Sequence, residues 1–299
     1  MINEDKNNLI SKPWARISSE WKKTVTPPMS PSPDDLKIYK KWIDKKCKKE
    51  ENLNVLVLGS TVEIRELLNG YDKLNITVCD INKNHYLAMS KLMKSINNKE
   101  FFIESEWSVA PLKKEFFDII IGDGIIANVE HKNKIKFMLN MVETLKHDGI
   151  MVIREAYIRE ERLVGIDEML LLFSNYKINT WSPMELLFSL EWAIYNRKTR
   201  KISFLKIARH LRRKYYDNKA KKFVYPPSKE VEKLLNHPTI LKWLEIKKEW
   251  DVFNYPETKK LIEKYFKIIA KEHGQDHLTL PTCKIFGDVM PIWVLARKN

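Results

Sequence analysis

Carboxylate side chains stand close behind three short apolar runs of this chain. Short continuous apolar runs are typical of parallel strands that are buried on both faces. The carboxyl ends of such strands meet at one edge of an open sheet, where ligands bind. A carboxylate there can accept hydrogen bonds from ribose hydroxyls, from an adenine amino group or from an ammonium group. The three candidates are Asp80 after Ile76–Cys79, Glu106 shortly after Phe101–Ile103, and Asp123 shortly after Ile119–Ile121.

Residues 54–80 are the most informative stretch of the sequence. They begin with an apolar run that predicts a strand, and Gly59 then permits a sharp turn without a side-chain clash. Ser60 and Thr61 can cap the amphipathic helix that follows, and a second strand ends in Asp80. This order is the front half of a nucleotide-binding α/β unit. An ordinary βαβ unit in which Asp80 only caps the next helix stays equally open.

The turn at Gly59 lacks the later glycines of a dinucleotide-binding loop, and Glu63 lies at the start of the helix. A carboxylate there repels a diphosphate but tolerates a zwitterionic amino-acid tail. The stretch resembles the class I S-adenosylmethionine-dependent methyltransferases. It is most similar to a divergent subgroup with Gly-Ser/Ala-Thr-x-Glu at this turn. The resemblance implies an α/β, Rossmann-like, seven-stranded sheet whose last strand is antiparallel, with S-adenosylmethionine as cofactor and S-adenosylhomocysteine as product.

The same resemblance implies roles for the residues at the strand ends. Gly59 would form the turn under the methionine part, Asp80 would bind the ribose, and Glu106 with Trp107 would bind adenine. Asp123 would hold the ammonium group or act as a base. The alternatives without ligand binding are a solvated loop at 104–107 and an ordinary turn at Gly122-Asp123-Gly124. The implied cofactor-binding residues are Gly59, Ser60, Thr61, Asp80, Ile81, Glu106, Trp107, Gly122, Asp123 and Gly124.

Residues 1–35 carry Trp14 and Trp21 ahead of the proline-rich segment TPPMSPSPDD. Prolines forbid a regular helix there and favour an extended or turning segment. The arm is either packed on the domain by its tryptophans or forms a flap over the site. The methyltransferase subgroup has a similar arm, so the resemblance implies that Trp14 and Trp21 contact the substrate.

Residues 158–273 are mostly helical by pattern and are punctuated by prolines. We interpret them as a helical insertion that covers the carboxyl edge of the sheet and shapes the substrate pocket. Inside it, residues 197–222 form a basic tract with interleaved aromatic side chains. That tract is either a solvated face, a site for an anionic partner such as RNA, or a site for a small anionic substrate.

Two strands are predicted at the end of the chain, over Thr282–Phe286 and Pro291–Ala296. They resemble the terminal antiparallel pair that completes the methyltransferase sheet. The predicted domains are an N-terminal arm and helix at 1–50, a cofactor-binding core at 51–157 with 274–299, and the helical insertion at 158–273.

Composition excludes few classes of function. The net charge of +14 fits a nucleic acid, an anionic lipid or an acidic partner, or a lysine-rich composition bias. Three widely spaced cysteines show neither a disulfide framework nor metal-ligand spacing, which favours a cytoplasmic protein without a metal. The polar N-terminus and the absence of a long apolar run predict no membrane segment. A homo-oligomer is left open.

Methyl transfer by in-line displacement needs positioning more than a protein nucleophile, so the lack of a nucleophilic triad does not argue against it. We therefore expect a methyltransferase acting on a small-molecule or peptide acceptor. An RNA-directed methyltransferase that uses the basic tract is one alternative, although Gly122–Ile125 lacks an amino-methylating Asn/Asp-Pro-Pro-Tyr signature. A non-catalytic scaffold of the same fold is the other, because the sequence departs from the usual methyltransferase pattern at Val57, Thr61, Glu63 and Glu106.

Overall fold

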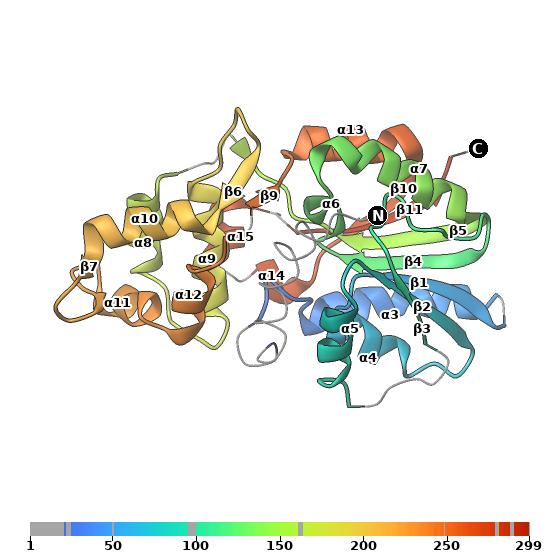
Figure 1. The fold of residues 1–299 in the computed structure, drawn as a ribbon, viewed down its shortest axis with the longest axis horizontal. Helices are drawn as coiled ribbons and strands as arrows, with labels where there is room; N and C mark the ends of the chain where they lie inside the picture. Colours follow the sequence, from blue (N-terminus) through green and yellow to red (C-terminus); the bar gives the residue numbers. More distant parts are fainter. Residues whose placement is uncertain are drawn as a thin grey trace.

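The computed structural model of the chain consists of a sheet lobe and a mainly helical lobe that lie side by side (Figure 1). The chain enters the sheet lobe first, leaves it for the helical lobe and returns to complete the sheet. The structure describes residue 21 and the ranges 25–49, 51–94, 100–160, 164–247, 249–278, 281–287 and 290–298.

The sheet lobe is built on a seven-stranded sheet in the order β10-β11-β5-β4-β1-β2-β3. β11 is antiparallel to both of its neighbours, whereas the pairs among β1 to β5 are parallel. The prediction of a seven-stranded methyltransferase sheet with an antiparallel last strand is therefore confirmed. The strands are β1 Leu53–Leu58, β2 Leu74–Asp80, β3 Phe101–Glu104, β4 Phe117–Asp123, β5 Leu145–Arg154, β10 Phe266–Glu272 and β11 Ile292–Arg297.

Helices cover both faces of this sheet (Figure 1). Successive side chains of β1 point to opposite faces, so Val57 packs in the core beneath α3 and α4, and Leu56 packs in the core beneath α7 and α13. Full burial of one such side chain contributes about 1.5–3 kcal/mol. The helices around the sheet are α3 Pro33–Cys47, α4 Val62–Leu68, α5 Lys83–Ser90, α6 Ile125–Asn128, the 3-10 turn η1 His131–Asn133, α7 Lys134–Thr144 and α13 Tyr255–Tyr265.

The predicted strand over Thr282–Phe286 is wrong, because residues Pro281–Phe286 form the helix α15. Phe286 packs against Trp192 of the helical lobe, with ring centroids 4.7 Å apart. The terminal antiparallel pair is formed by β11 and β10 instead. β10 lies in a segment whose apolar spacing predicts one continuous helix to Glu272. The helix α13 ends at Tyr265, and Phe266 takes extended backbone angles.

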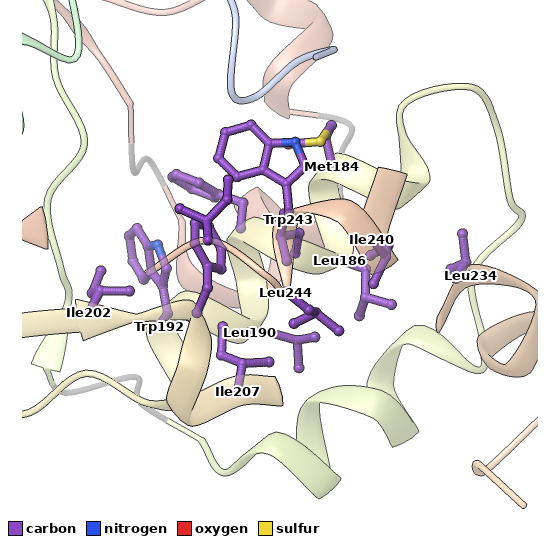
Figure 2. Packing of buried hydrophobic residues seen from close by; sticks show 14 of the residues in the cluster. Met184, Leu186, Leu190, Trp192, Ile202, Ile207, Leu234, Ile240, Trp243 and Leu244 are labelled. Atoms are coloured by element: carbon purple, nitrogen blue, oxygen red, sulfur yellow. The ribbon is translucent and has the colours of Figure 1, made fainter. Parts of the chain in front are cut away.

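The helical lobe surrounds α9, in which every residue from Ser182 to Trp192 is buried. Figure 2 shows apolar side chains of this lobe, including Trp192 and Trp243, gathered in one core. The lobe consists of α8 Ile166–Phe173, α9 Ser182–Ala193, α10 Phe204–Tyr215, α11 Lys229–Leu235, α12 Pro238–Trp243, α15, and the short strand pairs β6 Lys201–Ser203 with β9 Glu249–Asp251 and β7 Tyr216–Asp217 with β8 Lys222–Phe223. The short helix α14, Gln275–Leu278, lies between the lobes.

The division of the chain into three domains stays a prediction. β10 belongs to the sheet, and α13 packs beside α7. An insertion that contains neither of these elements therefore ends before Tyr255 and not at residue 273.

Candidate functional site

A cavity of about 500 Å³ lies between the carboxyl ends of β1, β2 and β4 and the helical lobe. Both lobes contribute to its wall. The sheet lobe contributes polar side chains and turns, and the helical lobe contributes mostly apolar side chains. Of the predicted cofactor-binding residues, those that line the cavity are Gly59, Ser60, Thr61, Asp80, Ile81, Glu106, Trp107, Asp123 and Gly124.

The turn after β1 brings its backbone to the cavity wall. Gly59 has φ +82°, in the left-handed region that favours glycine, and its N–H donates to the carbonyl of Cys79 at 2.9 Å. Thr61 is the N-cap residue of α4, yet its side chain makes no capping hydrogen bond. The hydroxyl of Ser60 instead donates to Asp80, at 2.6 Å from Oδ2. The expected side-chain cap is therefore replaced by a link between the two strand ends.

Asp80 ends β2 with its carboxylate held at the cavity. Oδ2 accepts from Ser60 and Oδ1 accepts from the N–H of Asn82 at 3.2 Å. The residue is only 7% exposed. Each carboxylate oxygen has a second lone pair, so Asp80 can still accept hydrogen bonds from a ligand.

The loop after β3 is fastened to its neighbours by Glu106 and Trp107. Glu106 Oε1 accepts from the hydroxyl of Ser108 at 2.7 Å and from the side-chain amide of Asn133 at 2.8 Å. The indole N–H of Trp107 donates to the carbonyl of Cys79 at 2.7 Å. A Cβ at Gly59 would lie 3.5 Å from the same indole ring. Trp107 thus forms a fixed wall of the cavity beside the first turn.

At the end of β4, both carboxylate oxygens of Asp123 accept from Arg154, at 2.6 and 3.0 Å. Burial raises the pKa of Asp123, and Arg154 opposes that rise. Gly124 turns the chain with φ +62°. Gly122 lies outside the cavity lining: a Cβ there would meet the side chain of Ile125 at 2.5 Å.

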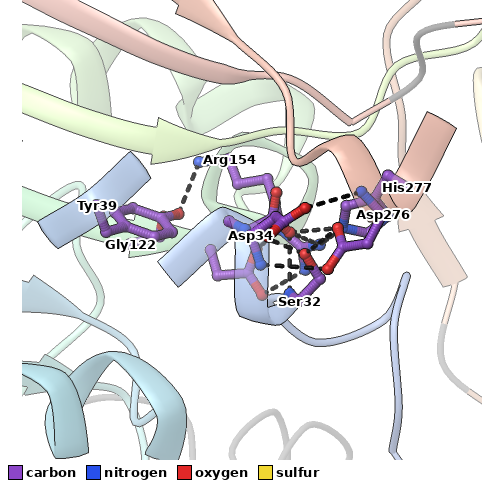
Figure 3. A network of polar contacts seen from close by, with 9 residues as sticks. Ser32, Asp34, Tyr39, Gly122, Arg154, Asp276 and His277 are labelled. Atoms are coloured by element: carbon purple, nitrogen blue, oxygen red, sulfur yellow. Dashed lines mark hydrogen bonds and ion pairs between the residues drawn. The ribbon is translucent and has the colours of Figure 1, made fainter. Parts of the chain in front are cut away.

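Asp123 belongs to a group of ionisable side chains with little exposure, Asp35, Asp123, Arg154 and His277, which we call the strand-end cluster. Figure 3 shows Arg154 and His277 of this cluster beside Tyr39 and Gly122. Arg154 donates to Asp35 Oδ2 at 3.0 Å, and His277 Nε2 lies 2.5 Å from the same oxygen. The hydroxyl of Tyr39 donates to the carbonyl of Gly122 at 2.8 Å and accepts from the N–H of Arg154 at 3.1 Å. The cluster therefore ties α3, α14, β4 and β5 together behind the cavity.

Charge complementarity within the strand-end cluster is strong. Burial alone would raise the pKa of Asp35, but Arg154 and His277 outweigh burial and leave that pKa at about 2. Sequence analysis did not identify Asp35, Arg154 or His277 as site residues. The available signal for Arg154 was its place at the end of an apolar strand, at the same edge as Asp80 and Asp123.

Of the described residues of the N-terminal arm, Trp21 and Met29 line the cavity. Trp21 is 6% exposed, and its indole N–H donates to Glu63 Oε1 at 3.1 Å. Burial raises the pKa of Glu63. Trp14, the other predicted substrate residue, lies outside the described residues.

The helical lobe supplies the wall that sequence analysis missed. Phe188 and Glu191 come from α9, Trp250 and Val252 come from β9 and the residue after it, and Met290 precedes β11. Burial raises the pKa of Glu191 to about 8. Glu191 is one of two glutamates, with Glu185, in the apolar helix sequence MELLFSLEWA, so the sequence does not single it out.

The basic tract 197–222 divides into two parts. Residues 197–201 line a second, polar hollow that shares Glu130 and Lys132 with the cavity. The α10 part lines neither hollow, and its Lys214 pairs with Asp167 of α8 at 2.6 Å. Within the described ranges, no group of three or more His, Cys, Asp or Glu side chains could hold a metal ion. No helix in the described part of the chain is long and apolar enough to cross a membrane.

No protein-family model matches the sequence, and no curated protein matches it. Solved structures do match the fold. A proposed Zn-dependent alcohol dehydrogenase from Rhodobacter sphaeroides aligns with TM-score 0.57 at 12% identity, covering 97% of this chain and 98% of that one. The 1,6-didemethyltoxoflavin-N1-methyltransferase of Burkholderia thailandensis, solved with its substrate and S-adenosylhomocysteine, aligns with TM-score 0.52 at 10% identity, covering 100% and 92%.

At such identities the likeness concerns the fold and not the activity. The order and directions of the strands distinguish the dinucleotide-binding sheet from the methyltransferase sheet. The doubly wound dinucleotide-binding sheet runs 3-2-1-4-5-6. Here the corresponding run is β3-β2-β1-β4-β5, and the antiparallel β11 then lies between β5 and β10. The chain therefore has the Rossmann-like, seven-stranded methyltransferase fold.

Proposed function

We propose that the protein is an S-adenosylmethionine-dependent methyltransferase that acts on a small-molecule acceptor. The single observation behind this proposal is the convergence of the predicted strand-end residues. The turn at Gly59, the carboxylate of Asp80, the pair Glu106–Trp107 and Asp123 line one cavity at the carboxyl edge of this particular sheet.

The residues at this edge fit the cofactor. Asp80 has free lone pairs for two ribose hydroxyls, and Trp107 offers an aromatic wall for adenine next to Glu106. Gly59 exposes backbone where the methionine part would pass. When bound, S-adenosylmethionine supplies a reactive methyl group on a sulfonium. The task left to the protein is to bind, orient and exclude water.

Asp123 fits a role in holding the cofactor better than a role as a base. Both of its oxygens already accept from Arg154, so a proton on Asp123 would weaken a buried ion pair. A fixed carboxylate at this place can still accept a hydrogen bond from the ammonium group of the methionine part. We assign Asp123 this positioning role.

The acceptor would bind at the lobe end of the cavity. Trp21 and the residues from α9 and β9 close that end, which favours in-line alignment of a small acceptor and exclusion of water. The neighbour from Burkholderia thailandensis was solved with the small molecule 1,6-didemethyltoxoflavin and with S-adenosylhomocysteine, which supports this choice. The α10 part of the basic tract lies outside the cavity lining, so RNA-directed methylation has less support.

Calorimetric titration of the full chain with S-adenosylmethionine and S-adenosylhomocysteine tests the proposal. We expect micromolar binding by the wild type and at least about a tenfold loss in Asp80→Ala, the effect of losing hydrogen bonds to a charged group. Glu104→Ala is the matched control. Glu104 ends β3 in register with Asp80 but lies outside the cavity lining, so its variant should bind like wild type. A folded wild type that binds neither compound would overturn the proposal and favour a non-catalytic scaffold.

A further inference from the structure

Glu191 stands out among the carboxyl groups that line the cavity. It is 7% exposed on α9, the central helix of the helical lobe. Its Oε1 is buried and has no hydrogen-bond partner among the described residues. Asp80 and Asp123, in contrast, each have partners for both carboxylate oxygens. A buried polar atom that lacks a partner is costly to leave unsatisfied, so a ligand group is expected to supply the missing donor.

The surroundings of Glu191 define what kind of donor fits. Phe188 lies one helical turn before it, and the other lobe residues of the wall are Trp250, Val252 and Met290. These side chains are apolar or aromatic. They can contact a hydrophobic frame, and the two aromatic rings can favour a cation through their faces.

A cationic amine matches this environment better than the alternatives. An ammonium group has three donors and no acceptor, so it satisfies the carboxylate and neutralises its charge. An anionic group offers no such donor, and its own charge would be buried beside Glu191 without a cation from these side chains. Burial raises the pKa of Glu191 to about 8, because no charged group of the described residues offsets the cost of burying its carboxylate. A bound cation would offset that cost.

We propose that Glu191 binds the amino group of the methyl acceptor, and that the acceptor is an amine carried on a small aromatic frame. This inference rests on the proposed function, because it names the class of acceptor for the same cavity. Glu191 is an acceptor-binding residue in this proposal, and the lobe end of the cavity determines specificity.

Binding of matched amines and acids to the full chain tests the inference. The probes are tryptamine and phenethylamine, with indole-3-propionate and 3-phenylpropionate as partners of the same size and opposite charge. Each is titrated at neutral pH with and without S-adenosylhomocysteine. In the wild type we expect both amines to bind ~10- to 100-fold more tightly than the acids, the range for a hydrogen bond to a charged group.

Glu191→Gln should remove this preference while it leaves binding of S-adenosylhomocysteine unchanged. Glu185→Gln is the matched control: Glu185 is a buried carboxyl on the same helix, but it accepts from the N–H of Thr282 and lies outside the cavity lining. That variant should keep the full preference for amines. Circular dichroism and thermal unfolding check that both variants fold.

The inference would be overturned by equal affinity of the wild type for amines and acids, by no amine binding in the wild type, or by an amine preference that survives in Glu191→Gln. Loss of S-adenosylhomocysteine binding in Glu191→Gln would assign a structural role and also overturn it. A wild type that prefers amines but binds neither S-adenosylmethionine nor S-adenosylhomocysteine would refute the proposed function alone.

Discussion

Two sets of buried ionisable side chains flank the same cavity from opposite lobes, and they differ in how they are paired. In the strand-end cluster, Arg154 is shared between two carboxylates, and His277 contacts one of them. On the other side, Glu191 has no charged partner among the described residues, and its buried Oε1 accepts no hydrogen bond from them. Asp35 Oδ1 also lacks a hydrogen-bond partner among these residues, so the two sides differ in whether a cation pairs with the carboxylate. The comparison teaches that equal burial serves two purposes. A paired group fixes the geometry of the fold, whereas an unpaired group is available to a ligand.

The largest expected effect comes from breaking the paired side. Arg154→Met leaves Asp35 and Asp123 buried without their cation, and we expect a loss of about 3–5 kcal/mol in the free energy of unfolding. Urea unfolding measures it. Arg197→Met is the control. The Arg197 side chain is 63% exposed, and its Nε lies as far as 3.8 Å from Glu160 Oε2, so no resolvable change in the free energy of unfolding is expected. A loss below about 1 kcal/mol for Arg154→Met would mean that the cluster is not a structural unit.

Glu191, the unpaired carboxyl group, should affect how the free energy of unfolding depends on pH. Burial, without a contribution from any charged group, raises the folded-state pKa of Glu191 from 4.5 to about 8. The folded state then binds the proton more tightly than the unfolded state, so stability falls as pH rises above the unfolded pKa. Glu191→Gln should gain about 3 kcal/mol relative to wild type between about pH 4 and pH 7. Urea unfolding at both pH values measures this gain. If the unfolding free energies of the variant and the wild type differed by the same amount at both, Glu191 would not be a buried carboxyl group without a cation.

Asp35 should show the opposite sign. Its folded pKa is lowered from 3.8 to about 2, so its contribution is present above the unfolded pKa and is lost as pH falls through about 2. The stability advantage of wild type over Asp35→Asn should therefore shrink by about 2 kcal/mol between about pH 5 and pH 2. Urea midpoints measured across this window test it. An advantage that grows on acidification would reverse the assigned role.

The smallest effect is expected at an exposed pair. Lys214→Met removes the contact with Asp167 on the helical lobe, where both side chains are about half exposed. Exposed ion pairs contribute little, so neither the thermal midpoint nor S-adenosylhomocysteine affinity should change measurably. A clear loss of affinity would show that the basic tract takes part in binding, and would weaken the focus on the cavity.

Local patterns were sufficient to predict the sheet edge. The turn at Gly59, the acid at the end of β2 and the Gly-Asp-Gly after β4 each follow an apolar run, and their chain position fixes where they lie in a parallel sheet. That is why nine of the ten predicted cofactor-binding residues line the cavity. Their roles toward a ligand stay predictions.

Features that depend on distant partners were not predictable. Residues 258–272 have helical spacing throughout, and only pairing with β11 makes the last seven a strand. Arg154 and Glu191 carry no local motif. Arg154 is distinguished by its contacts with Asp35 and Asp123 in the folded chain. Glu191 is distinguished by a buried Oε1 that meets no donor from the part of the chain that the structure describes.

The path of the chain between the lobes has a consequence for modularity. After β10 the chain returns to the helical lobe to form α15, whose Phe286 packs on Trp192. It then re-enters the sheet as β11, between β10 and β5. The helical lobe is therefore discontinuous in sequence. A single deletion of residues 158–254 would leave α15 without its hydrophobic partner, so a minimal sheet domain would need two separate deletions. For the same reason, several connections would restrain any swinging of one lobe relative to the other, unlike a lid on a single hinge.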